Sequence, residues 1–332
     1  MAPVIEADRL VKSYQVRQQS PGIKHALKAL FKPEYVVRHA LDEVSFSVEE
    51  GSITGLMGAN GAGKSTLVKL LVGIMQRDGG GLKVAGLDPF RERESYVGRI
   101  GVVFGQRSNL LWDLSVAESF ELHSAVFHVP PSEYAARLEE LTEIFDLEQL
   151  LRQPVRTLSL GQTMRCAVAQ VLLQRPDILF LDEPTIGLDV VSVELLGETL
   201  ARLNKAFNTT IVMTSHDLSI IESICHQVIL LNEGRVLFDG SSQQAMERYG
   251  RFRKLRFLFP AGADLSVAVN YLTDAGLEVT QGPSELIAMV DAETDVIGRY
   301  AALVDALTQR HGLLEFFMEK PSLKEVVLHA FQ

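Results

Sequence analysis

The first 240 residues alternate short, fully apolar runs with longer amphipathic stretches. Short unbroken apolar runs are typical of strands buried on both faces, and the stretches between them are long enough for the helices that connect parallel strands. Four such runs are residues 53–57, 100–104, 178–181 and 210–214. The pattern therefore predicts an α/β domain with a largely parallel sheet over residues 1–240.

The pattern changes after residue 240. A polar segment lies between Gly240 and Gly250, so we expect a linker at residues 241–252 and a second domain at residues 253–332. The second domain has strands expected at 254–259, 277–280, 285–290 and 313–318, and helices at 264–275, 296–310 and 323–331. Apart from the closing helix, this β-α-β-β-α-β order predicts a small α+β ferredoxin-like domain.

Composition and charge narrow the possible functions. The chain has 332 residues, 47% of them hydrophobic and 22% charged, which fits two ordinary globular domains. Its net charge of −10 argues against general affinity for nucleic acid, because binding to a phosphate backbone needs clustered cations. We find no signal-peptide pattern and no apolar run near the ~18 residues of a membrane span. Any membrane role is therefore expected through a partner.

The two cysteines, Cys166 and Cys225, lie in helical patterns. Neither belongs to a Cys-x-x-Cys pair or to a Cys/His cluster with metal-ligand spacing. We expect both to be unreactive thiols in the core.

A glycine-rich segment follows the first apolar run and precedes a helical pattern. It fits G-x-x-x-x-G-K-S/T, the P-loop, whose glycines let backbone N–H groups converge on phosphates. Lys64 would reach the β and γ phosphates of ATP, and the Ser65 hydroxyl would ligate Mg²⁺. The predicted ATP-binding residues of the loop are Gly58, Ala59, Asn60, Gly61, Ala62, Gly63, Lys64, Ser65 and Thr66.

Two carboxylates, Asp182 and Glu183, end the apolar run at 178–181. An aspartate in this position can hold a Mg²⁺-bound water, and an adjacent glutamate can polarise an attacking water as a general base. Taken alone, the pair fits a solvent-facing acidic strand end equally well.

Further motifs, which occur in a fixed order along the chain, favour a catalytic acidic pair over a solvent-facing strand end. The segment Leu158-Ser-Leu-Gly-Gln162 precedes a helical pattern, and Asp182-Glu183 follows it. With these motifs, residues 4 to 240 resemble the nucleotide-binding domain of ABC transporters. The resemblance implies a P-loop NTPase ABC cassette, with a RecA-like core and a helical subdomain at about 107–163. It also identifies Gln106 with the Q-loop, Gly187-Leu188-Asp189 with the D-loop and His216 with the H-loop.

The resemblance implies a head-to-tail homodimer in which each P-loop ATP is covered by the partner's signature segment. The catalytic residues would be Glu183, His216 and Gln106, and Mg²⁺ would meet Ser65, Gln106 and Asp182. Leu160 stands where the commonest family pattern has a second glycine, which puts one close backbone approach to ATP in question. The residues expected to contact ATP from this side are Ser159, Leu160, Gly161, Gln162 and Asp189.

An insertion at residues 15–39 sets this chain apart within the family pattern. Tyr14 fits the adenine-stacking aromatic, with Tyr35 as the alternative because about twenty extra residues follow Tyr14. Residues 22–32 have an apolar helical face and a row of lysines, and residues 9–39 hold seven Lys/Arg against one Glu. A basic amphipathic helix predicts contact with lipid headgroups or a permease, and a helix packed on its own domain is the alternative.

The insertion resembles that of ATPases serving polysaccharide exporters, and the wording of the motifs looks closest to exporter-type ATPases similar to drug- and sodium-efflux ATPases. Such a protein would hydrolyse ATP at the cytoplasmic face of the plasma (inner) membrane and drive separate integral membrane permease subunits. The alternative is a soluble ABC-type ATPase of translation or DNA repair, but this chain has one uninterrupted cassette. In an exporter subunit, Trp112 is expected to meet the permease, and the alternative is that it packs in the core. The basic run 251–256 is expected to be a solvent-facing strand edge rather than a nucleic-acid site.

Overall fold

The computed structural model describes residues 3–17, 35–105, 109–215, 217–250, 252–291, 296–322 and 325–326. The chain divides into two compact units, residues 1–241 and residues 242–332. Separate clusters of buried hydrophobic side chains lie in the two units, one that includes Ile5, Leu67 and Phe180, and another that includes Leu255 and Phe257.

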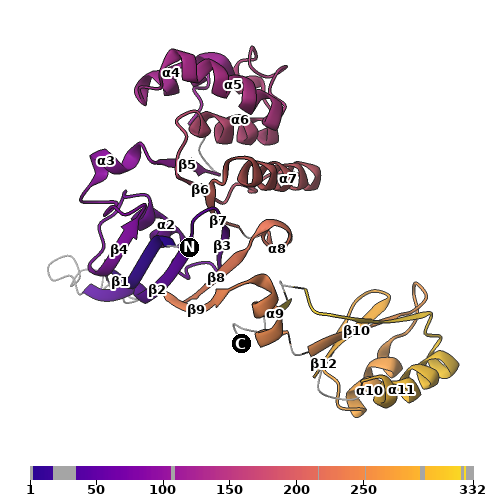
Figure 1. The fold of residues 1–332 in the computed structure, drawn as a ribbon. Helices are drawn as coiled ribbons and strands as arrows, with labels where there is room; N and C mark the ends of the chain where they lie inside the picture. The colour runs from indigo at the N-terminus through magenta and orange to yellow at the C-terminus, as the bar shows by residue number, and fades with distance from the viewer. Residues whose placement is uncertain are drawn as a thin grey trace, which may run out of the picture. The chain divides into compact units, whose positions relative to one another are not determined.

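A six-stranded sheet forms the centre of the first unit (Figure 1). Its first five strands pair in parallel, and the last pairs antiparallel with its neighbour. In order across the sheet the strands are β5 (Ile100–Phe104), β6 (Ile178–Asp182), β7 (Thr210–Thr214), β3 (Ile53–Gly58), β8 (Gln227–Asn232) and β9 (Arg235–Gly240). The predicted α/β fold is confirmed. Consecutive residues such as Leu179 and Phe180 are both 0% exposed, which explains why these strands have unbroken apolar sequences.

A three-stranded antiparallel sheet, in the order β2 (Tyr35–Glu49), β1 (Pro3–Arg17) and β4 (Gly79–Val84), packs its apolar face into the same core. The pairing of β1 with β4 ends at Val11, whereas the pairing of β1 with β2 continues to Arg17 opposite Tyr35. Both flanks of the expected insertion at 15–39 are therefore strands that form a two-stranded ribbon. The helix expected at 22–32 lies outside the described residues.

The helices α4, α5 and α6 are grouped beyond β5 and β6 in Figure 1. Two of them begin with a capping box, in which Ser115 bonds with Glu118 and Ser159 bonds with Gln162. The helical part runs to the end of α6 at Leu172, past the expected boundary of 163. The helices of the unit are α2 (Lys64–Leu71), α3 (Arg93–Val97), α4 (Val116–Val126), α5 (Pro131–Phe145), α6 (Leu160–Leu172), α7 (Val190–Phe207) and α8 (Leu218–Ile224).

The second unit begins with α9 (Ser242–Tyr249), which occupies the expected linker. A four-stranded antiparallel sheet follows, in the order β11-β12-β10-β13, with two helices. This is the predicted ferredoxin-like order; of the closing helix, only residues 325 and 326 are described. The elements are β10 (Phe252–Leu258), α10 (Ser266–Asp274), β11 (Val279–Gln281), β12 (Glu285–Asp291), α11 (Val296–His311) and β13 (Glu315–Glu319).

The prediction of a strand edge for the basic run was wrong, because β10 is a central strand. Arg256 forms ion pairs across the sheet with Glu285 on β12 (3.1 Å) and Glu319 on β13 (3.3 Å). These charges are matched by partners on neighbouring strands. The sequence of one strand does not show which residues of the neighbouring strands will lie beside it.

Both cysteines are buried and unpaired, as predicted. Burial raises the pKa of the Cys166 thiol and of the Cys225 thiol to about 12, so neither forms the reactive thiolate near neutral pH. In the part of the chain that is described, no helix combines the length and the hydrophobicity needed to cross a bilayer.

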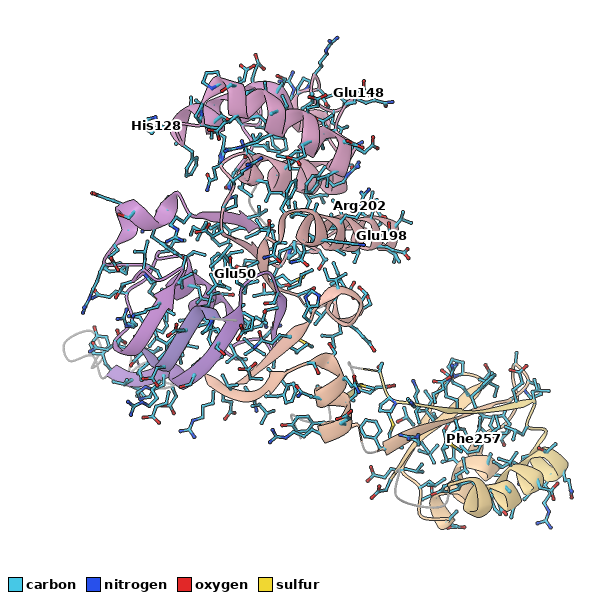
Figure 2. All side chains as sticks on the ribbon, in the orientation of Figure 1. Glu50, His128, Glu148, Glu198, Arg202 and Phe257 are labelled. Atoms are coloured by element: carbon cyan, nitrogen blue, oxygen red, sulfur yellow. The ribbon has the colours of Figure 1, made fainter. Side chains whose placement is uncertain are left out.

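The separate cores generate a stability prediction. Phe257, labelled in Figure 2, is 0% exposed in the core of the second unit. We expect Phe257→Ala to destabilise that unit by about 3–5 kcal/mol, because truncating a buried phenylalanine leaves a cavity. Hydrogen exchange followed by mass spectrometry should show faster exchange in peptides from residues 252–319 and unchanged exchange in peptides from residues 35–241.

Phe317, which is 41% exposed in the same sheet, supplies the matched control. Phe317→Ala should cost less than about 1 kcal/mol, as is usual for surface sites. Equal loss of protection in both units after Phe257→Ala would contradict independent cores.

Candidate functional site

The loop between β3 and α2 has the geometry of a phosphate-binding loop. Gly63 is the N-cap of α2 with φ 108°, and no side chain caps the helix. A Cβ atom at Gly63 would lie 2.5 Å from the carbonyl oxygen of Ala40, so only glycine fits there. The N–H groups of the first turn are therefore left for an anionic ligand, and the helix dipole favours one.

The other residues of the loop differ in exposure and in backbone conformation. Ala59, Asn60, Gly61 and Ser65 are exposed, Thr66 is half-buried in the first turn, and Ala62 is buried. Gly61 has φ 83° and open space around it, so the loop is shaped by backbone conformation as well as by packing.

Lys64, the first residue of α2, lies beneath the loop. Its side chain is largely buried, and Nζ donates hydrogen bonds to the carbonyl oxygens of Gly58 (2.7 Å) and Ala59 (3.2 Å). Burial lowers the pKa of Lys64, and the nearby carboxylates of Glu183 and Asp182 act against this shift. The fold thus brings the lysine of the loop close to the acidic pair at the end of β6.

A threonine on the neighbouring strand holds the acidic pair. Asp182 is in register with Thr214 on β7. The Thr214 hydroxyl donates to Oδ1 of Asp182 (2.7 Å) and accepts from the backbone N–H of Glu183 (2.8 Å). In the sequence, Thr214 is only the last residue of the apolar run 210–214, and its role depends on pairing between strands distant in the chain. The alternative of a merely solvent-facing acidic pair does not account for this arrangement.

The backbone at Glu183 is unusual. Glu183 has φ 55°, in the left-handed region that costs a non-glycine residue roughly 1–3 kcal/mol. A Cβ atom at Gly105, just after β5, would collide with the carbonyl oxygen of Glu183, and the Gly105 N–H donates to the carbonyl oxygen of Asp182 (2.7 Å). Gly105 is therefore required to let two loops approach closely.

Gln106 and His216 lie outside the described residues, but their neighbours are described. Gly105 precedes Gln106, and its backbone N–H donates a hydrogen bond to the carbonyl oxygen of Asp182. Ser215 is buried, its Oγ lies 3.0 Å from Oγ1 of Thr185, and it accepts a hydrogen bond from the N–H of Asp217 (2.9 Å). Both loops are thus anchored to the segment that carries the acidic pair.

The residues present fit a magnesium ion together with a nucleotide. Mg²⁺ favours one or two carboxylates plus substrate phosphate oxygens, rather than a cage of protein ligands. Asp182 ends β6 beside the P-loop lysine, and Ser65 has an exposed hydroxyl in the first turn of α2. Among the described residues, no group of three or more His, Cys, Asp or Glu side chains is placed to hold a metal ion by itself.

The signature segment begins α6, in the helical part of the first unit. Ser159 accepts from the N–H of Gln162 (3.2 Å), and Gln162 accepts from the N–H of Ser159 (2.9 Å). Leu160 is 59% exposed, so its side chain needs no room in the core. A Cβ atom at Gly161 would lie 2.7 Å from the Ser192 hydroxyl, which explains a glycine at this position.

Asp189 has a structural task in this conformation. Its carboxylate accepts hydrogen bonds from the Ser192 N–H (2.9 Å) and hydroxyl (2.8 Å), and so caps α7. These bonds lower the pKa of Asp189, which strengthens the charged cap at a helix N-terminus.

Tyr14 and Tyr35 both lie on the ribbon formed by β1 and β2. Tyr14 is opposite Arg38, and its hydroxyl lies 3.1 Å from the sulfur of Met75, just beyond α2. Tyr35 is opposite Arg17, three pairs farther along the ribbon, which at ~3.3 Å per residue is roughly 10 Å. Tyr14 is therefore the tyrosine that lies against the α2 region.

Trp112 is 68% exposed, so of the two alternatives for it, packing in the core does not hold. Its backbone carbonyl accepts from the N–H of Arg156 (3.1 Å), which fixes the loop while the indole ring faces outward.

Known proteins similar to this chain identify its family. The family model described as ABC transporter matches residues 41–186. The daunorubicin resistance ATP-binding protein DrrA3 of Streptomyces coeruleorubidus is 33% identical over 297 residues, which cover 89% of this chain and 92% of that protein. The methionine import ATP-binding protein MetN 2 of Enterococcus faecalis is 35% identical over 205 residues, which cover 60% of this chain and 59% of that protein.

A bacterial ABC transporter cassette solved as a dimer is 26% identical, with a TM-score of 0.58, over 71% of this chain and 98% of that one. The first unit therefore has the fold of an ABC transporter cassette. The chain therefore belongs to the family of ABC transporter ATP-binding subunits, which bind ATP with Mg²⁺ and couple its hydrolysis to transport.

Proposed function

We propose that this chain is the ATP-hydrolysing subunit of an ABC exporter, and that it works as a homodimer with separate permease subunits at the cytoplasmic face of the membrane. The observation that carries the ATPase assignment is the approach of Lys64, which follows β3, to Asp182 and Glu183, which follow from β6, at the carboxyl edge of the parallel sheet. A soluble ATPase of translation or DNA repair is not favoured, because the relatives described above are transport or resistance proteins.

Each residue of the site has a separate task in hydrolysis. The N–H groups of the P-loop and Lys64 bind and orient the β and γ phosphates of ATP. Ser65, Asp182 and Gln106 would hold Mg²⁺, which supplies positive charge to the phosphate oxygens when it is bound. Tyr14 stacks against adenine.

Glu183 takes a proton from the attacking water. The hydrogen bond from its backbone N–H to Thr214 holds the residue in its left-handed conformation, so the carboxylate is positioned before the substrate arrives. His216 contacts the γ-phosphate and helps to orient the water.

The signature segment serves the ATP of a partner protomer. Ser159, Gly161 and Gln162 are at the start of α6, which Figure 1 shows with α4 and α5 rather than beside α2. Exposed apolar side chains lie at this helix start and beside Gly187 and Ser192, which approach Leu160 and Gly161, and such side chains are typical of an interaction surface. They are Leu160 (59%), Ile186 (41%), Val190 (83%) and Val191 (73%). We define these four residues as the signature patch.

The lengths of the matches with the resistance protein and with the methionine importer support export. The match with the daunorubicin resistance protein covers 89% of this chain, so it reaches into the second unit, whereas the match with the methionine importer covers 60%. The second unit is therefore a feature shared with a resistance protein.

A hollow next to β5 offers a docking place for a permease helix. Its volume is about 300 Å³, and its walls are mainly apolar side chains, including Ile74, Phe104 and Phe127. His123 also lines it, and burial lowers the pKa of His123 to about 4, so the ring is neutral near pH 7. Arg93 also lines the hollow, but it is exposed and donates to the carbonyl oxygen of Gly73 (2.8 Å), so an apolar helix face can enter beside it while its charge stays in water. Trp112, which is exposed, lies in the segment between β5 and α4.

Glu183→Gln tests the catalytic assignment. The variant keeps the shape of the side chain but loses the carboxylate, so turnover should fall at least about 100-fold while ATP binding persists. Steady-state phosphate release with saturating Mg-ATP measures this. Glu194→Gln, an exposed carboxylate on α7, is the matched control and should hydrolyse like wild type.

Lys64→Ala should behave differently, because it removes a charge directed at the phosphates and should weaken nucleotide binding itself. If Glu183→Gln hydrolyses ATP within a few-fold of the wild-type rate, Glu183 is not the general base.

Dimerisation through the signature patch can be tested in the Glu183→Gln background, where bound ATP should persist. We expect ATP to convert this protein from monomer to dimer in size-exclusion light scattering, and we expect added Val191→Asp to prevent the conversion. Val126→Asp, at a valine on α4 that is 64% exposed, is the matched control and should still dimerise. A Val191→Asp protein that dimerises as well as the control would exclude this surface.

The ribbon of β1 and β2 is the proposed contact of the insertion with the permease or the membrane. Exposed apolar side chains lie at its end, among them Tyr35 (57%) and Val37 (54%). Both belong to β2, the strand that follows the basic segment 22–32 in the sequence. Replacing Tyr35 and Val37 with Glu should reduce co-purification of the permease subunits several-fold, while ATP binding by the isolated chain remains.

The control for this experiment is Val267→Glu, at a residue in the second unit that is 54% exposed. Unchanged recovery of the complex with the ribbon variant would favour a segment that packs only on its own domain.

A further inference from the structure

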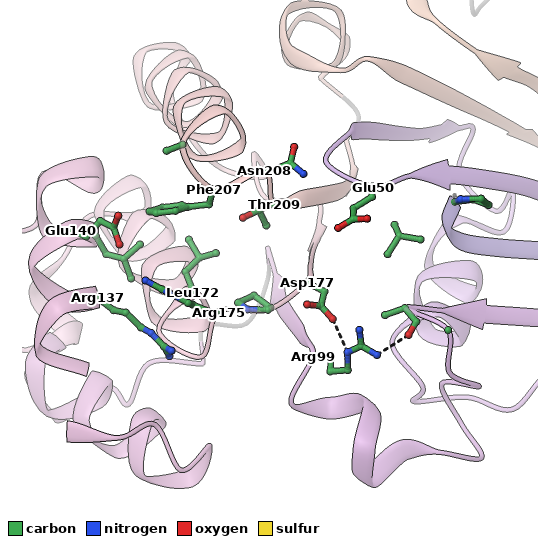
Figure 3. Close-up of a pocket in the computed structure, with 17 residues that line it drawn as sticks. Glu50, Arg99, Arg137, Glu140, Leu172, Arg175, Asp177, Phe207, Asn208 and Thr209 are labelled. Atoms are coloured by element: carbon green, nitrogen blue, oxygen red, sulfur yellow. Dashed lines mark hydrogen bonds and ion pairs between the residues drawn. The ribbon is translucent and has the colours of Figure 1, made fainter. Parts of the chain in front are cut away.

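A second hollow lies at the opposite edge of the parallel sheet from the P-loop. Its volume is about 730 Å³, which is within the usual range of ligand sites of ~300–1,000 Å³. It is lined by the segments that lead into β5, β6 and β7, by α5, and by turns of the antiparallel sheet (Figure 3). We call it the amino-edge hollow, because parallel strands begin there and end at the ATP site.

Part of the lining of the amino-edge hollow is apolar, and we call this part its floor. Leu141 and Leu172 line it and are 3% and 6% exposed, and Pro176 is also buried. Phe207, which is half-buried, contributes an aromatic side chain to the same wall. An apolar group of a ligand would be removed from water on this floor, and burial stabilises such contact by roughly 25 cal/mol per Å².

Two of the three arginines that line the hollow are already paired. Arg99 forms an ion pair with Asp177 (2.6 Å) and donates to the carbonyl oxygen of Ala85 (2.7 Å). Arg137 pairs with Glu133 and donates to the carbonyl oxygen of Leu173. Their charges are therefore largely neutralised before any ligand binds.

Three charged side chains of the lining are left over. Within the described part of the chain, no ion pair or side-chain hydrogen bond is found for Arg175, Glu140 or Glu50. In the view of Figure 3, Arg175 lies between Glu140 of α5 and Glu50 of the turn before β3. The available groups are thus one guanidinium and two carboxylates, over an apolar floor.

We propose that the amino-edge hollow binds a small zwitterion with an apolar body, of amino acid to short peptide size. Its anionic group pairs with Arg175, its ammonium group pairs with Glu140, and its apolar body lies on Leu172 and Phe207. A polyanion such as a nucleotide would meet the two unpaired carboxylates, and a simple cation would meet Arg175. Only a molecule with both charges satisfies both kinds of group. This site is separate from the ATP site and does not depend on the proposed export function.

L-phenylalanine is the probe, because it carries a carboxylate, an ammonium group and an apolar ring. Titrated into the full chain by calorimetry or saturation-transfer NMR, it should bind with a Kd on the order of 1 mM, which is reasonable for twelve heavy atoms. Phenylacetate lacks the ammonium group and phenethylamine lacks the carboxylate, so each should bind about tenfold more weakly.

Variants then assign the groups. Arg175→Gln should weaken L-phenylalanine and phenylacetate about tenfold but leave phenethylamine unchanged, and Glu140→Gln should do the reverse. The matched controls are the exposed residues Arg152 and Glu139, and Arg152→Gln and Glu139→Gln should bind all three compounds like wild type.

Three results would overturn the proposal. The first is no saturable binding of L-phenylalanine up to tens of millimolar, the second is binding that Arg175→Gln and Glu140→Gln leave unchanged, and the third is tighter binding of phenylphosphate than of L-phenylalanine. The melting temperature of each variant, measured alone, should stay within a few degrees of wild type, since Arg175 is exposed and Glu140 only half-buried.

Discussion

The parallel register of β5, β6 and β7 is the constraint on which the catalytic site depends. It sets Phe104, Asp182 and Thr214 side by side, so that the three loops that follow leave the sheet at one edge. The Thr214 hydroxyl then joins Asp182 to the backbone of Glu183. A slip of one residue would turn every side chain of a strand to the other face and would separate these groups. Thr210 and Thr214, buried polar residues at the two ends of β7, would lose their hydrogen-bond partners in such a slip, which resists it.

The same register explains why the site tolerates strain. Glu183 is held at φ 55°, and Gly105 supplies the space in which the two loops pass each other. A conformation of this kind persists only where the surroundings determine it, and here hydrogen bonds from both neighbouring strands do so. The left-handed backbone changes the direction of the chain just after Asp182. Two adjacent carboxylates can therefore have different tasks, one toward the metal ion and one toward water.

The two edges of the parallel sheet differ in chemistry. At the carboxyl edge, unsatisfied helix N–H groups and Lys64 favour phosphates. At the amino edge, the hollow presents charges of both signs, the guanidinium of Arg175 and the carboxylates of Glu140 and Glu50. In the second unit, Arg256 is placed between Glu285 and Glu319, so its charge is paired within the sheet. In each case the partners across the fold decide the character of a surface.

The sequence by itself determined those features whose residues are contiguous. The P-loop, the strand that ends in Asp182-Glu183 and the capped helix at Ser159 each depend on local conformation and periodicity, and so did the β-α-β-β-α-β order of the second unit. Tertiary structure alone decided the role of Thr214, which lies 32 residues from Asp182, the outward position of Trp112 and the central place of β10. The amino-edge hollow likewise needs several distant segments. Such features depend on hydrogen bonds and burial between segments far apart in the chain, and hydrophobic periodicity carries no record of these pairings.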